Sequence, residues 1–241
     1  MPNNVEKMTF NYSPNFDSIK RTKKQIKYLI FHYTGMKNDQ SAIKKLTSEK
    51  SKVSCHYYIN KKGELIQIVP ELYIAWHAGK SKWKNDNLLN KNSIGIEISN
   101  PGHEYGYKKF NKAQIKCLIE ISKKLIKKYR INKKNILGHS DISPLRKKDP
   151  GEKFPWRFLS TKNIGLWHKV NFSNLKKLRG KKIDLEINFF LTQLKKFGYF
   201  TKHSNSNELK KIIKSFQRRF RPELVNGKLD KECLEILKSL N

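Results

Sequence analysis

The sequence predicts an α/β fold in which helices flank a mixed central β-sheet, followed by a small unit of three helices. Short apolar runs typical of buried strands surround one long amphipathic segment in the first part of the chain, whereas only helical periodicity recurs near its end. The order strand, helix, strand indicates helices packed on a sheet. With 241 residues the chain can form one medium-sized domain and a small one.

The first strands follow from short apolar runs. Residues 28–31 are too few for a helix and suit a buried strand, and His32 follows at its end. A small apolar stripe predicts a helix over residues 41–50. Residues 56–59 and 65–69 are expected to form a hairpin, because the residues between them include a glycine that can adopt a positive φ.

The next elements bring polar side chains to strand ends. Residues 94–98 alternate isoleucine with other residues, so a strand would bury the isoleucines and turn Glu97 toward an accessible face. Apolar residues at helical spacing predict the longest helix at 111–130. A short strand at 136–137 then leads to His139, which we expect to project into a cleft.

Composition divides the chain into four segments. Residues 1–22 are polar and irregular and are expected to be a lead-in, and residues 161–182, rich in Lys, Asn, Ser and Gly, a linker. The main domain would span 23–160 and the helical unit 183–241. Three helices are expected in that unit: one ending at Gly198, one over 209–220 and one over 230–240.

The chain is strongly basic, with 52 Lys and Arg against 20 Asp and Glu and a formal net charge of +32. Such a charge raises the question of a polyanionic partner. Nucleic acid is disfavoured, because nearly all the positive charge is lysine rather than arginine and no nucleic-acid-binding motif accompanies it. A solvated surface produced by compositional bias and attraction to another anionic polymer both remain open.

The cysteines and the N-terminal sequence give information about the cellular compartment of the protein. Cys55, Cys117 and Cys233 form no CxxC pair and are odd in number, so neither a disulfide framework nor a thiolate metal site is expected. The N-terminus lacks the apolar core of a secretory signal, and no apolar run is long enough to span a membrane. We expect a cytoplasmic protein, with the periplasm or cell envelope as the alternative if a signal was removed.

The segment from Gly138 to Gly151 contains a candidate metal site. It offers His139 and Asp149, and with His32 it provides two imidazoles and one carboxylate. Zinc prefers such donors in a tetrahedron, and catalytic zinc sites leave the fourth position to water. Taken alone, a histidine after an apolar run is more often a core or surface residue, and an aspartate before proline more often a turn residue.

Five short motifs follow one another between about Lys27 and Trp156. They are His32-Tyr33-Thr34, Ser54-Cys55-His56-Tyr57, Ala75-Trp76-His77-Ala78-Gly79, Ser93-Ile94-Gly95-Ile96-Glu97, and the pattern Gly-His-x-Asp-x-x-Pro-x-Arg-Lys-x-Asp-Pro-Gly over 138–151. In this order they resemble the motifs of the zinc-dependent N-acetylmuramoyl-L-alanine amidases, a family that includes the peptidoglycan recognition proteins. The resemblance implies the α/β fold of those proteins.

The resemblance also implies roles for single residues. It assigns zinc binding to His32, His139 and Asp149, the role of general base to Glu97, and stabilisation of the oxyanion to Lys147. It suggests a further group as substrate-binding residues: Tyr33, Trp76, His77 and Arg146. Without the resemblance, Glu97 would be a surface residue on an edge strand, Lys147 one solvated lysine among many, and His77 half of a packed Trp–His pair.

The end of the chain carries its own resemblance. Its marks are Leu191-Thr192-Gln193-Leu194-Lys195-Lys196-Phe197-Gly198-Tyr199, then Phe216-Gln217, then Gly227-Lys228-Leu229-Asp230. They resemble the small three-helix peptidoglycan-binding domain. Cys233 stands where that family often has threonine, so a helical packing unit that binds no ligand remains the alternative.

Together the resemblances imply an enzyme that hydrolyses the amide bond between the lactyl group of N-acetylmuramic acid and L-alanine. Its substrate would be peptidoglycan or (1,6-anhydro) muropeptides, its cofactor Zn²⁺, and no protein partner is implied. The positive charge would then favour an anionic wall surface or acidic muropeptides. The alternative is a recognition module that binds peptidoglycan without cutting it, which the presence of all five proposed metal and catalytic residues disfavours.

Overall fold

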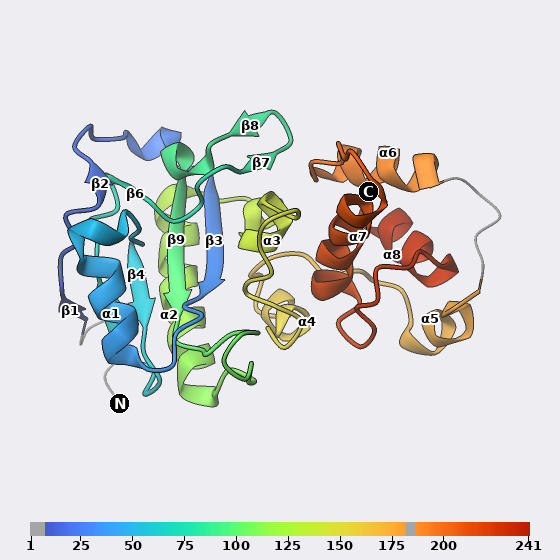
Figure 1. Ribbon diagram of the computed structural model, residues 1–241. Helices are drawn as coiled ribbons and strands as arrows, with labels where there is room; N and C mark the ends of the chain where they lie inside the picture. The colour runs from blue at the N-terminus through green and yellow to red at the C-terminus, as the bar shows by residue number, and fades with distance from the viewer. Residues whose placement is uncertain (1–7, 182–186) are drawn as a thin grey trace.

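The computed structural model describes residues 8–181 and 187–241, and Figure 1 shows a sheet-containing part beside a group of helices. The strands are β1 (Thr9–Phe10), β2 (Phe16–Asp17), β3 (Tyr28–Tyr33), β4 (Tyr57–Ile59), β5 (Leu65–Gln67), β6 (Ile74–Ala75), β7 (Lys82–Trp83), β8 (Asp86–Asn87), β9 (Ser93–Ile98) and β10 (Ile136–Gly138). The helices are α1 (Asp39–Thr47), α2 (Lys112–Tyr129), α3 (His139–Ile142), α4 (Trp156–Ser160), α5 (Phe172–Leu178), α6 (Ile187–Phe197), α7 (Ser206–Phe220) and α8 (Lys231–Leu240).

The main sheet is mixed, as predicted. Its strand order is β1-β5-β4-β9-β3-β10, in which only β4 and β5 pair antiparallel and the other neighbours are parallel. The hairpin between β4 and β5 turns through Gly63, whose φ of +79° is one that glycine adopts without strain. The expected strand at 65–69 is shorter, because ladder pairing stops after Gln67.

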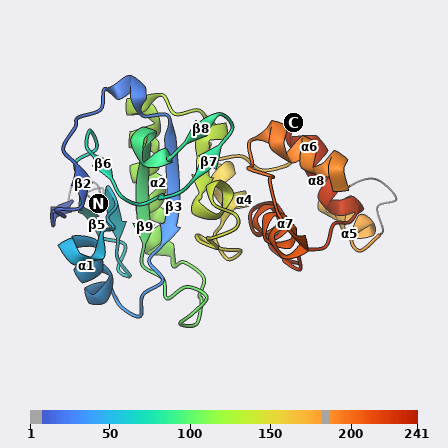
Figure 2. The same cartoon turned by 45° about the horizontal axis from the view of Figure 1, so that its top comes forward.

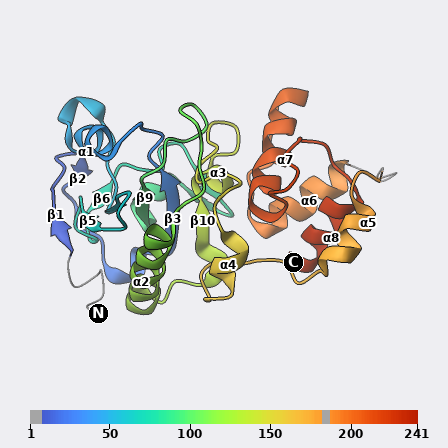
Figure 3. The ribbon, with the colours of Figure 1, turned by 90° about the horizontal axis from the view of Figure 1, so that it is seen from below.

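Helices cover both faces of this sheet (Figure 3). The long helix α2 lies on one face and α1 on the other. Alternate residues of the central strands pack against α2. They are fully buried and include Leu29, Phe31, Ile94 and Ile96. The expected helices at 41–50 and 111–130 correspond to α1 and α2, and Asn38 and Asn111 cap their first turns through side-chain oxygens.

Parallel pairing decides which residues meet at the end of the sheet. In the register between β3 and β9, His32 lies opposite Glu97, and in that between β3 and β10, Phe31 lies opposite Gly138. His139 follows Gly138 directly and begins α3. Two histidines distant in sequence therefore leave the sheet at the same end.

The expected lead-in is more ordered than its sequence indicates. Strand β1 extends the sheet by pairing with β5, and β2 pairs with β6. Arg21 is buried and its guanidinium donates hydrogen bonds to main-chain oxygens of four residues: Glu71, Tyr73, Asn90 and Ser93. Within residues 8–22, sequence reasoning missed these two short strands, because two-residue strands pair through the backbone and leave no periodic pattern.

The helical part packs against the β10 side of the sheet, with α3 and α4 between them (Figures 1 and 2). Helices α6, α7 and α8 correspond to the three expected helices, and α6 ends before Gly198. One apolar cluster joins Tyr28, Ile30 and Trp83 of the first part to Phe216 of α7. The expected linker 161–182 contains α5, and the expected start of the helical unit, residues 183–186, lies outside the described residues.

The three cysteines, Cys55, Cys117 and Cys233, are buried free thiols. No helix in the described ranges has the length and apolar character needed to cross a membrane.

Candidate metal centre

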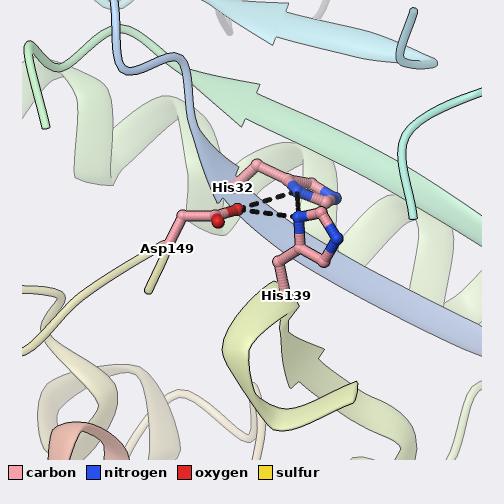
Figure 4. A group of neighbouring side chains, drawn as sticks. All are labelled: His32, His139 and Asp149. Atoms are coloured by element: carbon pink, nitrogen blue, oxygen red, sulfur yellow. Dashed lines mark hydrogen bonds and ion pairs between the residues drawn. The ribbon is translucent and has the colours of Figure 1, made fainter. Parts of the chain in front are cut away.

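Three side chains converge at the end of the sheet (Figure 4). His32 comes from β3, His139 from the first residue of α3, and Asp149 from the loop before Pro150. The two Nδ1 atoms lie 3.0 Å apart, and Asp149 Oδ2 lies 3.0 Å from that of His32 and 3.1 Å from that of His139. All three residues are buried, and one donor atom from each faces the same point.

Hydrogen bonds orient the imidazole of His139. Its Nε2 lies 3.0 Å from the main-chain oxygen of Ala78, an atom that only accepts, so Nε2 carries the proton. A neutral imidazole protonated there has its lone pair on Nδ1, the nitrogen that faces His32 and Asp149.

A longer relay orients His32. The Ser93 hydroxyl donates to the main-chain oxygen of Leu89 at 2.5 Å, so Ser93 Oγ accepts from His77 Nε2 at 3.1 Å. His77 Nδ1 is then an acceptor, and His32 Nε2 donates to it at 3.0 Å. The Nδ1 lone pair of His32 is left facing the other two donors. The relay fixes one tautomer for each of two rings.

Charge also suits cation binding. Burial, followed by the neighbouring His139, lowers the pKa of His32 to about 4, so its ring is neutral at pH 7. Burial alone would raise the pKa of Asp149, but the positive charge that His139 and His32 carry in acid holds that pKa below its usual range, so the carboxylate is ionised at pH 7. A neutral imidazole and an ionised carboxylate are the forms that ligate a metal.

Glu97 lies beside this group on β9. Its Oε2 is buried and has no hydrogen-bond partner among the described residues. Burial, and then the charge of Asp149, raise the pKa of Glu97 well above its usual value, while Lys147 opposes the shift. A carboxyl group with a raised pKa is suited to exchanging protons near neutral pH.

A cavity of about 370 Å³ opens next to the three donors. The predicted site residues that line it are Tyr33, Trp76, His77, Glu97, His139, Arg146, Lys147 and Asp149. Four of its lining residues are basic side chains: Lys45, Arg146, Lys147 and Lys148. Three others, Glu97, Glu104 and Asp149, are acidic, so the lining combines both signs of charge.

The residues predicted to bind substrate have internal partners as well. Tyr33 Oη lies 2.9 Å from His103 Nδ1, and Trp76 Nε1 donates to Asp17 Oδ1 at 2.7 Å. Arg146 Nη2 donates to three oxygens: main-chain oxygens of Ala78 and Lys80, and Ser143 Oγ. His77 lies in the relay beneath His32, with both ring nitrogens engaged. Its predicted contact with substrate would have to use the ring edge.

Sequence reasoning did not single out Ser93 or Gly95 as supports of the site. A Cβ atom at Gly95 would lie 2.4 Å from Cγ of His77, so only glycine lets that ring lie over β9. A glycine inside an apolar strand was the available signal, since it often marks a close approach. No sequence feature indicates the hydroxyl of Ser93, because its role depends on the packing of His77.

Two buried imidazoles and a carboxylate at the mouth of a polar cavity are typical of metal-dependent hydrolases, as is a glutamate beside them with one buried oxygen that no described residue satisfies. Residues 22–152 match the family described as N-acetylmuramoyl-L-alanine amidase. The chain belongs to this family.

Known proteins agree with this assignment. AmiD, an N-acetylmuramoyl-L-alanine amidase of Escherichia coli K12, is 37% identical over 232 residues, which cover 90% of this chain and 82% of AmiD. The structure of E. coli AmiD with anhydro-N-acetylmuramic acid-L-Ala-D-γ-Glu-L-Lys has a TM-score of 0.81 at 34% identity, covering 93% of this chain and 91% of that chain. AmpDh3 from Pseudomonas aeruginosa, in complex with anhydromuramic pentapeptide, has a TM-score of 0.81 at 30% identity, covering 93% and 96%. The predicted fold and enzyme class, an N-acetylmuramoyl-L-alanine amidase, are confirmed.

Proposed function

We propose that this amidase is zinc-dependent and hydrolyses the bond between the lactyl group of N-acetylmuramic acid and L-alanine in muropeptides. The observation that carries the proposal is the convergence of His32, His139 and Asp149 at one buried point. Glu97 and Lys147 line the adjoining cavity, where acid–base and electrostatic catalysis would be needed.

The donor set fits zinc. Tetrahedral ligands at about 2.1 Å from a zinc ion lie roughly 3.4 Å from one another, and the three donor atoms are separated by 3.0 to 3.1 Å. Two nitrogen lone pairs and a carboxylate oxygen facing each other repel unless a cation lies among them. Two imidazoles with one carboxylate, and an open side toward the cavity, are the ligands of a catalytic rather than a structural zinc site.

Bound zinc would supply Lewis acidity toward the substrate carbonyl and lower the pKa of a bound water to about 7. Glu97, with its unpaired buried oxygen, would accept the proton of the attacking water and deliver it to the departing amide nitrogen. Lys147 would stabilise negative charge that develops on the carbonyl oxygen. Water is the nucleophile, and the products are a lactyl carboxylic acid and a peptide with a free amino group.

The residues that line the cavity and the related amidases both support a class of substrate. The basic cavity residues suit the carboxylates of a stem peptide. Structures of AmiD and AmpDh3 with anhydromuropeptides support a small anhydro-muropeptide as one substrate. The three-helix unit would bind wall polymer and raise the local concentration of the cleavable bond, which supports intact peptidoglycan as another. Cell fractionation would decide between the cytoplasm and the envelope.

Metal analysis and hydrolysis assays test the proposal. We expect about one zinc per chain and release of stem peptide from anhydro-muropeptides, and loss of both in the variant His139→Ala. Full activity after exhaustive chelation would exclude zinc dependence. Zinc binding and muropeptide binding without any peptide release would instead favour the recognition module.

A further inference from the structure

Helix α7 reaches the turn that carries the metal ligand His139. Asp141 lies two residues after His139 and is almost fully buried. Its Oδ2 accepts a hydrogen bond from the main-chain nitrogen of Gly138 at 2.8 Å and forms an ion pair with Arg219 of α7. Its Oδ1 accepts from the hydroxyl of Tyr199 at 2.5 Å. Among the described residues, the two that contact this carboxylate from outside its own turn, Tyr199 and Arg219, both belong to the helical part.

Arg219 contacts more than the carboxylate. Its Nη2 donates to the main-chain oxygen of Ile136 in β10 at 3.0 Å, and its guanidinium lies 4.2 Å from the ring centre of Trp156 in α4. The side chain is 2% exposed. Strand β10, the turn after it and α4 are therefore all held by one arginine from α7.

A second contact links α7 to both ligand-bearing segments. Ser215 Oγ donates to the main-chain oxygen of Ser140 at 2.6 Å. The main-chain nitrogen of Ser140 in turn donates to the main-chain oxygen of Asp149 at 2.8 Å. Ser140 thus joins the segments that carry two of the three donors, and α7 holds Ser140 from its other side.

We propose that Tyr199, Ser215 and Arg219 form a clamp that positions His139 and Asp149 for metal binding, which makes the helical part a component of the metal centre. This inference rests on the proposed zinc site. A module that only tethers an enzyme to the wall needs no contact with the ligand-bearing turn. Buried ion pairs are costly to desolvate and often add little net stability, so we infer that the buried Arg219–Asp141 pair acts by fixing the position of the turn. Hydrogen bonds behind metal ligands usually change metal affinity when removed.

The chain offers a matched control for Arg219. Arg221, two residues along, is 1% exposed and pairs with two buried acids, Asp230 and Glu232. These partners lie in the helical part, away from the turn of His139. Arg219→Met and Arg221→Met each break a buried arginine–carboxylate pair, and both should lower the melting temperature. Only the change at Arg219 also loosens the ligand turn.

The test measures the zinc dissociation constant of the folded full-length chain by competition with a chromophoric chelator. We expect Arg219→Met to weaken zinc binding about 10- to 100-fold, and Arg221→Met to leave it within about twofold of wild type. Tyr199→Phe and Ser215→Ala remove one hydrogen bond each and should stay folded, with smaller losses. The rate of zinc release should rise most in Arg219→Met and less in Tyr199→Phe and Ser215→Ala.

Wild-type affinity in folded Tyr199→Phe and Ser215→Ala, or an equal loss in Arg221→Met, would overturn the clamp while the zinc proposal stands. Active wild-type protein that binds no zinc would instead overturn the proposed function and the clamp with it. Weakened zinc binding confined to the three clamp variants would support the inference.

Discussion

The central strands β3 and β9 have two chemically different faces. The face toward α2 is wholly apolar at the centre, with Phe31 and Ile96 fully buried. The opposite face carries His32, Gly95 and Glu97 at its site end, where the strands contact His77 and the cavity, whereas Tyr28 and Ile30 on the same face pack in a separate apolar cluster. The same backbone thus supplies a rigid support on one face and reactive groups on the other.

The difference explains how a buried polar site is tolerated. Burying imidazoles and carboxylates costs free energy unless each is hydrogen-bonded or paired. On the site face, the Ser93–His77–His32 relay and the Ala78 contact satisfy the ring nitrogens that do not face the candidate metal. The apolar face supplies the burial that stabilises the strands carrying them. Changes on the two faces should therefore have separable effects.

The largest effect should come from Glu97 on the site face. Glu97→Gln keeps the shape of the side chain and removes its capacity to accept a proton. We expect kcat to fall about 10²- to 10⁴-fold, with zinc content and melting temperature close to wild type. Steady-state hydrolysis of an anhydro-muropeptide, with zinc measured in parallel, provides the test. Retained kcat would mean that another group serves as the base.

A change on the apolar face should lower stability and leave kcat unchanged. Ile96→Ala creates a cavity against α2 and should lower the free energy of unfolding by about 2–5 kcal/mol. The protein that remains folded should keep wild-type kcat and zinc affinity. Urea denaturation and assays well below the transition would measure both. Altered zinc binding in folded Ile96→Ala would show that the two faces are not independent.

Gly95 tests the site face without changing a polar group. In Gly95→Ala the new methyl would overlap the ring of His77, and such overpacking costs about 1–3 kcal/mol. Because the shifted ring no longer holds His32, zinc affinity should fall as well. In a double-mutant cycle, the cost of Gly95→Ala should shrink when His77 is already alanine. Additive costs would mean that the methyl group collides with something else.

The smallest effect concerns Glu71, a charged group that joins α2 to the sheet. It accepts from the hydroxyl of Tyr57 at 2.5 Å, from Tyr129 and from Lys128. Burial alone would raise the pKa of Glu71, but Lys128 and the two tyrosines lower it. A lowered folded-state pKa stabilises the protein above the ordinary carboxyl pKa, and this contribution is lost as pH falls through the folded-state value.

Glu71→Gln should therefore lower the free energy of unfolding at pH 7 by about 1.5 kcal/mol. The difference in the free energy of unfolding between this variant and wild type should narrow as pH falls below about 4.3, the pKa of a glutamate in the unfolded chain. Chemical denaturation between pH 3 and pH 7 would measure it, and amidase activity should not change. A gap independent of pH would contradict the ionic contribution of Glu71.

Much of the fold was predictable, because local patterns carry it. Alternation placed the isoleucines of β9 in the core and Glu97 on the site face, and helical spacing located α2 and α7. The order in β1 and β2 was missed, since two-residue strands have no period to detect. Helix α5 was missed for a related reason, because its seven residues carry only one buried side chain, Leu175.

The sequence alone determined the chemical types of the three candidate metal donors, the order of the family motifs and the alternation that separates the two faces of β9. Such information is local, because it depends on residue type and spacing. Only the tertiary structure decided the tautomers of His32 and His139, the role of Gly95 beneath His77 and the contact of Arg219 with Asp141. These features join residues far apart in the chain, and hydrogen bonds and packing act through space, where sequence spacing gives no measure of distance.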